Sequence, residues 1–333
     1  MKNTSIDTRH ISDKLIAHLR NELKNPEVEY RSPLDQLQGG FETSIFRFQL
    51  KGVGDEYSQF LVLRLYPQFY GPGNAPWEST IQNALAGVGY PAAKAHFVCT
   101  DMSILGGAFF VMDYIPGQPL MFAHPETVPG LLGETHATLH KIDPQRLISA
   151  LKEQGFDDHG YRLDSGFNWM QETAIKLPWI DEGVRWLIEN RPPEPEHLAV
   201  CHGDFHALNI LVEKEVVTGI VDWGGFRVAD PVFDIANTIV LTTIPAKHLS
   251  DNWEGFASVD WDLAVELYLS AYKKHKELDS TNLDFYRVRR CLLALIQGYE
   301  GQKVWQHPMI VRDLVAYIQK ITGIKITLPV RQE

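Results

Sequence analysis

The sequence predicts an α+β protein with a small β-rich N-terminal lobe (1–115) and a larger helical C-terminal lobe (116–333). Two patterns indicate this class. Apolar and polar residues alternate over 45–50 and over 59–67, which is the period of half-buried strands. From about residue 124 onward the apolar spacing becomes helical, except for one middle segment with two short apolar strands. A chain of 333 residues also has the length of roughly two domains.

The N-terminal lobe is expected to begin with a helix and to continue as an antiparallel sheet with one further helix. Ser12 can cap the first helix, because Leu15 and Leu19 follow it on one apolar stripe. After Pro33 the pattern becomes that of strands. The expected strands are 45–50, 59–67, 95–100 and 107–115, and the expected second helix is 77–89.

The C-terminal lobe is expected to be helical around a single β-hairpin. The strands of this hairpin are 209–212 and 219–223, and the polar turn 213–218 joins them. A helix is expected to follow Pro231. The other expected helices are 128–143, 167–175, 181–191, 261–278, 285–305 and 310–321.

Composition and charge exclude several classes of protein. With 44% hydrophobic and 22% charged residues the chain can form a full core, which excludes a disordered or fibrous chain. Its 31 Lys and Arg against 42 Asp and Glu give a formal charge of −11, so no binding of nucleic acid or of an anionic membrane is expected. The three cysteines form no CxxC pair, which excludes a disulfide framework or a zinc ribbon. No run approaches about 18 consecutive apolar residues, so a cytoplasmic protein is expected.

One stretch, residues 201–238, places carboxylates and an amide at spacings that suit phosphoryl transfer. Asp204 precedes Asn209 by five positions, and Asp222 follows at the end of a predicted strand. Mg²⁺ prefers oxygen ligands and usually takes one or two of them from the protein, which Asn209 and Asp222 can supply. Asp204 can then accept the proton of an attacking hydroxyl without being bound to the metal.

The same stretch resembles a known family of kinases. Protein kinases carry H-R-D-L-x-x-x-N and then D-F-G, and the corresponding strings here are His202-Gly203-Asp204…Asn209 and Asp222-Trp223-Gly224. Together, HGDFHALN, IVDW and DPVFDIA resemble the aminoglycoside phosphotransferase/choline kinase family of small-molecule kinases. The resemblance implies the two-lobed protein-kinase-like fold, ATP or GTP as co-substrate, Mg²⁺ as cofactor and a small-molecule acceptor as the partner.

The resemblance also implies roles for single residues of the motif. Asp204 would be the catalytic base, and Asn209 and Asp222 would be the Mg²⁺ ligands. His206 stands two positions after Asp204, where protein kinases often have a lysine that touches the γ-phosphate, so it would share the catalytic role.

Two further residues would support the site. His202 can hydrogen-bond the backbone that positions Asp204. Asp234 would brace the catalytic loop from the start of a helix, and as an alternative it would be an N-cap-like acceptor for the helix after Pro231.

In the N-terminal lobe the resemblance implies a nucleotide-binding set. Arg64 stands where kinases have the strand lysine that contacts the α- and β-phosphates, with Glu78 as its candidate partner or, alternatively, as a solvated helix residue. The pair Gly39 and Gly40 would lie over the phosphates, and a plain hairpin turn is the alternative. The full set is Gly39, Gly40, Ser44, Arg64 and Glu78, with Met112, Asp113, Tyr114 and Ile115 as a hinge for the adenine edge.

The expected function is a phosphotransferase that moves the γ-phosphate of ATP (or GTP) to a hydroxyl of a small molecule. The acidic charge slightly favours an aminoglycoside or another amine-bearing acceptor. Two alternatives remain open. One is a catalytically idle nucleotide-binding module, and the other is a metal-dependent hydrolase with the ligands His202, Asp204, His206 and Asp222.

Overall fold

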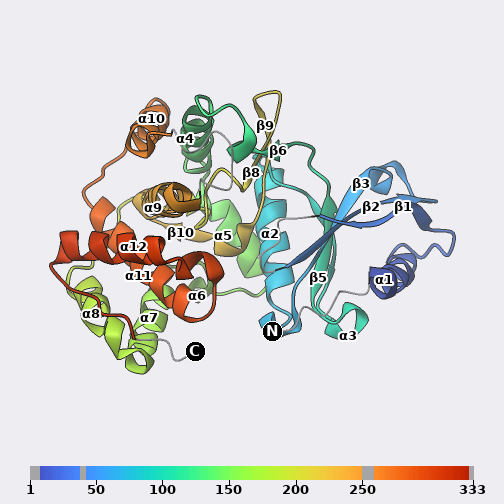
Figure 1. Cartoon of the computed structure of the whole chain (residues 1–333). Coiled ribbons are helices and arrows are strands. Elements are labelled where there is room, and N and C mark those ends of the chain that lie inside the picture. Colours follow the sequence, from blue (N-terminus) through green and yellow to red (C-terminus); the bar gives the residue numbers. More distant parts are fainter. Residues whose placement is uncertain (1–7, 38–42, 250–258, 330–333) are drawn as a thin grey trace. The chain divides into compact units, whose positions relative to one another are not determined.

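The computed structural model describes residues 8–37, 43–249 and 259–329. The chain forms two compact units and passes between them several times. The described part of unit 1 contains a five-stranded sheet, and that of unit 2 is mostly helical (Figure 1), so the predicted α+β class is confirmed. Unit 1 consists of Met1–Gly117, Arg146–Phe156 and Thr218–Gly224, and unit 2 of Gln118–Gln145, Asp157–Val217 and Gly225–Glu333.

The sheet of unit 1 is antiparallel. Its strands are β1 (Glu29–Gln36), β2 (Ser44–Lys51), β3 (Phe60–Leu65), β4 (Ala95–Cys99) and β5 (Phe109–Asp113), in the order β1-β2-β3-β5-β4. The strand β1 begins before Pro33, earlier than predicted, and its register with β2 shifts between Ser32 and Asp35. Because Pro33 lies on an edge strand and at this irregularity, its missing N–H costs the sheet little.

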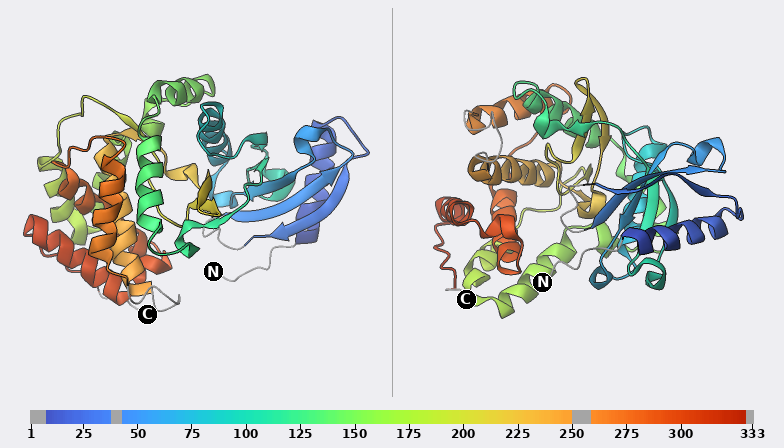
Figure 2. Two further views of the ribbon diagram at one scale, coloured as in Figure 1. Left: turned by 90° about the horizontal axis from the view of Figure 1, so that it is seen from above. Right: turned by 45° about the vertical axis from the view of Figure 1, so that its right-hand side comes forward.

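Two helices cover the two faces of the sheet. The helix α1 (Thr8–Glu22) buries Leu15 in a core that it shares with β2 and β3. The helix α2 (Asn74–Gly87) places Ala75 in a second core with Phe110 of β5 and with other residues of β3 and β5. Figure 2 shows α1 along one side of the twisted strands. Both faces of the central strands are thus covered, which supports the residues on β3.

Two later segments of the chain complete unit 1. The helix α5 (Pro144–Glu153), which the sequence did not lead us to expect, brings Phe156 against Trp77 with ring centroids 5.1 Å apart. The second segment enters through the strand β9 (Val216–Ile220), where the backbone N–H of Ile220 donates to the carbonyl of Pro91. The short helical elements are α3 (Met102–Leu105), η1 (Asp55–Tyr57), η2 (Gln68–Tyr70) and, after β9, η5 (Trp223–Gly225).

Unit 2 is built around the long helix α9 (Pro231–Leu249), which follows Pro231 as expected. Its apolar residues share one core with those of α7, α8, α11 and α12. The predicted helix 285–305 ends earlier than expected, at Tyr299, and Gly301 follows with φ +115°. The other helices are α4 (Val128–Leu139), α6 (Asp158–Tyr161), α7 (Asp164–Lys176), α8 (Asp181–Glu189), α10 (Trp261–Lys273), α11 (Leu283–Tyr299), α12 (Pro308–Thr322), η3 (Leu120–Phe122), η4 (Pro178–Ile180) and η7 (Lys303–Gln306).

Short strands frame the motif in unit 2. They are β6 (Gln118–Pro119), β7 (Ala199–Cys201), β8 (Ile210–Glu213) and β10 (Arg227–Ala229), and the pairs β6–β8 and β7–β10 are antiparallel. The turn after β8 is made by Lys214 and Glu215 with φ 49° and 63°, as in a type I′ hairpin turn. Of the described helices, none combines the length and the apolar character that crossing a membrane requires.

Candidate active site

The segment between β7 and β8 carries Asp204 and is called the catalytic loop below. Gly203 precedes Asp204 with φ +83°, a conformation that glycine adopts without strain. A Cβ atom at Gly203 would also come within 2.1 Å of the carbonyl oxygen of Gly225. Glycine is therefore required at this position for the backbone to turn tightly before Asp204.

Asp204 is held by two side chains of its own loop. The Oδ2 atom of Asp204 lies 3.3 Å from Nε2 of His206 and 3.4 Å from Nδ2 of Asn209, and this amide also donates to the carbonyl of Asp204 at 2.9 Å. The backbone N–H of Leu208 donates to Nδ1 of His206, which leaves the proton of a neutral ring on Nε2, toward Asp204. The structure therefore brings Asp204, His206 and Asn209 together.

The surroundings of Asp204 keep its carboxyl group ionised. Burial acts to raise its pKa, but the charge of His206 and the hydrogen bond from it, with the charges of Arg290 and His202, together bring the pKa well below the ordinary range. The side chain nevertheless remains 42% exposed, so a small molecule can reach it. An exposed carboxylate with a depressed pKa can orient a hydroxyl group and accept its proton.

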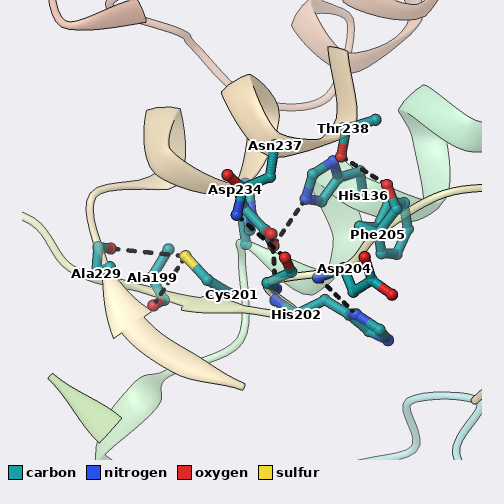
Figure 3. A network of polar contacts seen from close by, with 12 residues as sticks. His136, Ala199, Cys201, His202, Asp204, Phe205, Ala229, Asp234, Asn237 and Thr238 are labelled. Carbon is teal, nitrogen blue, oxygen red and sulfur yellow. Dashed lines mark hydrogen bonds and ion pairs between the residues drawn. The ribbon is translucent and has the colours of Figure 1, made fainter. Parts of the chain in front are cut away.

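Asp234 anchors the catalytic loop through its backbone (Figure 3). Its carboxylate accepts hydrogen bonds from the backbone N–H groups of His202, at 2.6 Å, and of Gly203, at 2.8 Å. The N-cap-like alternative for Asp234 is wrong, because the side chain of Asp230 accepts the hydrogen bond from the N–H of Val232 in the first turn of α9. Asp234 lies one turn further along α9 and points to the loop instead.

His202 supports the loop in the way that the sequence suggested. Its Nδ1 accepts the backbone N–H of Asp204 at 3.2 Å, and its side chain is fully buried (Figure 3). The ring of His202 also meets that of Phe205 edge-on, with centroids 5.7 Å apart. His202 thus fixes the backbone on which Asp204 is mounted.

Four further side chains, which we had not predicted, complete the surroundings of Asp234. His136 and His140 on α4 place their Nε2 atoms 3.0 Å and 3.3 Å from Oδ2 of Asp234. Their Nδ1 atoms lie 2.7 Å and 2.8 Å from the hydroxyl groups of Tyr268 and Tyr272 on α10. Each tyrosine therefore donates to a histidine, and each histidine donates to Asp234.

The charges in this network follow from its burial. Burial and the neighbouring His140 lower the pKa of His136 to about 4, and burial also lowers the pKa of His140. Burial alone would raise the pKa of Asp234, but the hydrogen bonds and charges of the two histidines bring it far below its usual range. At neutral pH the network is one carboxylate that accepts four N–H groups.

His136, His140 and Asp234 lie close enough together to hold a metal ion, but their hydrogen bonds argue against one. His136, His140 and Asp234 have ligand atoms within 4.8 Å of one another. A metal would have to displace the protons on both Nε2 atoms and compete with the N–H of His202 for the same Oδ2. The hydrogen-bonded network satisfies every one of these groups without a metal.

Unit 1 holds a second cluster of charged groups, around Arg64 of β3. The Nε atom of Arg64 lies 3.2 Å from Oε2 of Glu78, and Nη2 donates to Oδ1 of Asp222 at 2.8 Å. Glu78 is 1% exposed, so the alternative of a solvated Glu78 is wrong and its predicted ion pair with Arg64 is present. Tyr66 donates its hydroxyl proton to Glu78, a contact that the sequence had not indicated.

The pKa values in this cluster reflect two carboxylates that share one arginine. Burial raises the pKa of Glu78, and the charge of Asp222 acts in the same direction, although Arg64 opposes both. Burial alone would lower the pKa of Arg64, but the two carboxylates raise it above its usual value. Arg64 is therefore permanently charged, and Glu78 is the group whose ionisation is costly.

Asn209 and Asp222 each offer an oxygen atom of the kind that Mg²⁺ binds. The amide nitrogen of Asn209 is used in hydrogen bonds, whereas its Oδ1 accepts none from the described residues. Asp222 has φ +69°, its side chain is 47% exposed, and Arg64 occupies only its Oδ1. An amide oxygen and a carboxylate oxygen are the hard ligands that Mg²⁺ prefers.

The other residues of the predicted nucleotide-binding set lie in unit 1. Ser44 is the first residue of β2, while Gly39 and Gly40 fall outside the described residues. The backbone N–H groups of Asp113 and Tyr114 already donate to the carbonyls of Lys94 and Phe60. Of the predicted hinge segment Met112–Ile115, these two N–H groups are therefore not free to bind an adenine edge.

The residues that we had missed carry only weak signals in the sequence. His136 and His140, like Tyr268 and Tyr272, are spaced i, i+4, which places each pair on one helix face. The two pairs are 132 positions apart, so only the fold brings them together.

Comparison with known proteins gives a family and a fold. The phosphotransferase enzyme family matches residues 34–267. An aminoglycoside 3'-phosphotransferase of Streptomyces fradiae is 32% identical over 202 residues, which cover 54% of this chain and 66% of that protein. Acyl-CoA dehydrogenase family member 11 of Gallus gallus is 30% identical over 173 residues, which cover 48% of this chain and 22% of that protein. The chain thus spans less than a third of the length of the first curated relatives that it matches.

Solved structures agree on the fold. A putative aminoglycoside phosphotransferase from Ralstonia eutropha aligns with a TM-score of 0.61 at 20% identity, over 92% of this chain and 98% of that one. An amicoumacin kinase in complex with AMP-PNP aligns with a TM-score of 0.61 at 13% identity, over 96% of this chain and 97% of that one. The predicted protein-kinase-like fold is confirmed, and the chain belongs to the phosphotransferase enzyme family.

Proposed function

We propose that this protein transfers the γ-phosphate of ATP (or GTP) to a hydroxyl group of a small molecule. The observation that carries the proposal is the catalytic loop of unit 2. It presents Asp204 as an exposed, ionised carboxylate, and three N–H groups and a buried carboxylate fix the backbone beneath it. Membership of a phosphotransferase family supports the reaction class.

In the proposed reaction Asp204 orients the acceptor hydroxyl and takes its proton. The acceptor oxygen forms a bond to the γ-phosphorus, the bond from that phosphorus to the β–γ bridging oxygen breaks, and the nucleoside diphosphate leaves. Much of the rate enhancement comes from positioning, because the transferring group needs little covalent assistance. The low pKa of Asp204 means that it is ready as a carboxylate throughout the neutral pH range.

The remaining roles concern the nucleotide and its metal. Asn209 and Asp222 are the proposed ligands of Mg²⁺, which supplies positive charge at the phosphates when bound. Arg64, held by Glu78, adds a permanent positive charge for the same phosphates. His206, which lies beside the carboxylate of Asp204, is the proposed side-chain contact to the γ-phosphate.

The acceptor class and the location are finer proposals. An aminoglycoside or another amine-bearing acceptor is suggested by the charge of −11 and by the name of the Streptomyces fradiae relative. That charge belongs to the whole chain and not to the site. A kinase that uses ATP or GTP would work in the cytoplasm.

The two alternatives receive less support. In the hydrolase alternative His202 would ligate a metal, but its Nδ1 already accepts the N–H of Asp204. Among the described residues, His202, Asp204 and His206 are not part of any group whose ligand atoms converge as a metal requires. An idle module would have no use for the exposed carboxylate of Asp204 together with its supporting network.

The test is a phosphorylation screen of the purified protein with ATP and GTP. Acceptors would include aminoglycosides, macrolides, choline, ethanolamine, homoserine, sugars and simple hydroxy acids. We expect Mg²⁺-dependent transfer to at least one hydroxyl, with slow hydrolysis of ATP when no acceptor is present. Asp222→Ala should abolish both reactions. A tightly bound stoichiometric transition metal in the purified protein, or ATP turnover that Asp222→Ala leaves intact, would contradict the proposal.

A further inference from the structure

Two adjacent arginines of α11 are buried in unit 2 without a counter-ion among the described residues. Arg289 is 7% exposed and Arg290 is 5% exposed. Among the described residues, neither forms an ion pair with a carboxylate, although the chain has 42 acidic residues. Burial of a guanidinium group without a paired anion is unfavourable, so this arrangement calls for a reason.

The hydrogen-bonding capacity of the two side chains is almost unused. Arg289 donates to no described residue, and its Nε atom is fully buried without an acceptor. Arg290 donates only to the side-chain oxygen of Gln297, at 3.3 Å. Each guanidinium has five N–H donors and no acceptor, so most donors of this pair lack a partner in the described part of the chain.

Aromatic rings hold the arginines but do not satisfy them. The Cζ atom of Arg289 lies 5.3 Å and 5.2 Å from the ring centroids of Phe167 and Phe233, and that of Arg290 lies 4.7 Å from the ring of Trp305. A ring face attracts the cation, but it offers no acceptor to the N–H groups at the edge of the guanidinium plane. The ring contacts therefore do not satisfy the N–H donors of the two guanidinium groups.

Arg227 is a further cation whose charge acts on Arg289, and the charge of Arg290 acts on the carboxyl group of Asp204. Burial and the charges of Arg227 and Arg290 lower the pKa of Arg289 to about 10. Arg290 is close enough to Asp204 for its charge to lower the pKa of that carboxyl group. Arg227 lies in β10 opposite Cys201, directly before the catalytic loop. The charge of Arg290 thus acts on the carboxylate at which the acceptor would react.

We propose that Arg289 and Arg290 bind an anionic group, a carboxylate or a phosphate monoester, on the acceptor whose hydroxyl group faces Asp204. This inference rests on the proposed function and names its substrate class. Arginine suits the task, because its planar fork matches both anions in a bidentate manner. An acceptor of this class differs from the amine-bearing one that the net charge favours, and the two can be separated by experiment.

The binding test uses three matched compounds that share a hydroxyl group: glycerol, glycerate and glycerol 3-phosphate. Thermal unfolding of the nucleotide-free protein is followed at constant ionic strength as each compound is added. We expect glycerate or glycerol 3-phosphate to raise the unfolding temperature in a saturable way, while glycerol and choline do not. Absence of a saturable shift with both anions, or an equal shift with glycerol, overturns the inference.

The variants are Arg289→Met and Arg290→Met, with Arg287→Met as the control on the same helix. Arg287 lies beside Asp284 and over the ring of Tyr317, so its charge is paired. The dissociation constant of the anion should rise about tenfold to a hundredfold in the first two variants and stay unchanged in the control. Without anions, Arg289→Met should unfold at the same or a higher temperature, because an uncompensated buried charge has been removed. Unaltered anion binding in both test variants overturns the inference.

Kinase assays separate this inference from the proposed function. Transfer to hydroxy acids, with a KM that rises in Arg289→Met while the KM for ATP does not, supports both. Efficient transfer to choline or an aminoglycoside but not to anionic acceptors overturns the inference and keeps the kinase. Saturable anion binding that depends on Arg289 and Arg290, without phosphoryl transfer to any acceptor, supports the anion site and contradicts the kinase.

Discussion

Glu78 in unit 1 and Asp234 in unit 2 are both buried carboxylates, yet their surroundings shift their pKa values in opposite directions. Asp234 accepts four N–H groups from His202, Gly203 and two histidines, and no other carboxylate among the described residues accepts from these donors. Its pKa is therefore lowered although it is 0% exposed. Four well-placed donors outweigh the cost of burial.

Glu78 has a cation beside it and still titrates above its usual value. It shares Arg64 with Asp222, and the charge of Asp222 adds to the effect of burial. An arginine that is shared with a second acid thus stabilises a buried carboxylate less than a complete set of hydrogen-bond donors does. We therefore expect Asp234 to stay ionised and Glu78 to take up a proton more readily.

The largest effect is expected from replacement of Asp234. In Asp234→Asn the amide cannot accept four N–H groups, and its own NH₂ faces donors, so the free energy of unfolding should fall by about 3 to 5 kcal/mol. Urea unfolding measures this change. Phosphoryl transfer should fall as well, since the backbone beneath Asp204 loses its anchor. A loss below about 1 kcal/mol would show that the network contributes little.

The next largest effect is that of pH on stability. His136 has an ordinary pKa of 6.5 when unfolded and about 4 in the fold, so between these values the unfolded chain binds more protons. Stability therefore falls as the pH falls, by about 2 kcal/mol between pH 7 and pH 5 from this group alone. Glu78 acts in the opposite direction, because its raised pKa lets the folded protein take up a proton more readily.

Two variants separate these opposing contributions. As the pH falls to 5, the free energy of unfolding measured with urea should fall less in His136→Gln than in the unaltered protein, because the amide does not titrate. It should fall more in Glu78→Gln, from which the compensating proton uptake is absent. The opposite order of the two slopes would contradict the charge states given for both clusters.

A smaller effect is expected from the tyrosines of α10. Tyr268→Phe removes the donor to Nδ1 of His136 and leaves a buried acceptor without a partner, at a cost of about 1 to 3 kcal/mol. Tyr286→Phe is the matched control, because Tyr286 is 4% exposed and its hydroxyl bonds to no described residue. Its free energy of unfolding should change by less than about 0.5 kcal/mol. Equal losses in both variants would contradict a special role for Tyr268.

The smallest effect on stability is expected from Glu78→Gln. The amide keeps the size of the side chain and removes a charge whose burial is costly. Its oxygen can accept the N–H of Trp223, and its NH₂ group can donate to the hydroxyl of Tyr66, which accepts as well as donates. The free energy of unfolding should fall by at most about 1 kcal/mol, while the KM for ATP rises because Arg64 loses a partner. A loss of unfolding free energy as large as that of Asp234→Asn would contradict the difference proposed between the two carboxylates.

The sequence predicted the fold class and most of the long elements, because apolar periodicity is strong where strands and helices are long, but it missed the helix α5. It did not predict β7 and β10, since three residues are too few to show a period. It also misplaced the start of β1, where Pro33 was taken as a boundary although an edge strand can tolerate it.

For the candidate site, the sequence predicted what lies within one motif or at a fixed offset from it. His202 and Asp234 hold the loop, and Glu78 pairs with Arg64. The tyrosines of α10 could not be predicted as part of the site, because their histidine partners lie 132 positions away. The burial of Arg289 and Arg290 could not be predicted either, because it depends on how α11 packs in the fold. Charge counted along the chain cannot show that Arg289 forms no ion pair with any described acidic residue.

The role proposed for Asp204 is tested most directly by the rate of Mg²⁺-dependent phosphoryl transfer by Asp204→Asn. This variant keeps the shape of the side chain and removes the carboxylate that would orient the acceptor and take its proton. We predict a turnover lower by two to four orders of magnitude, as for the loss of a general base, with nucleotide binding and folding unchanged. A variant that works as fast as the unaltered protein would show that the exposed carboxylate of the loop has no part in the reaction.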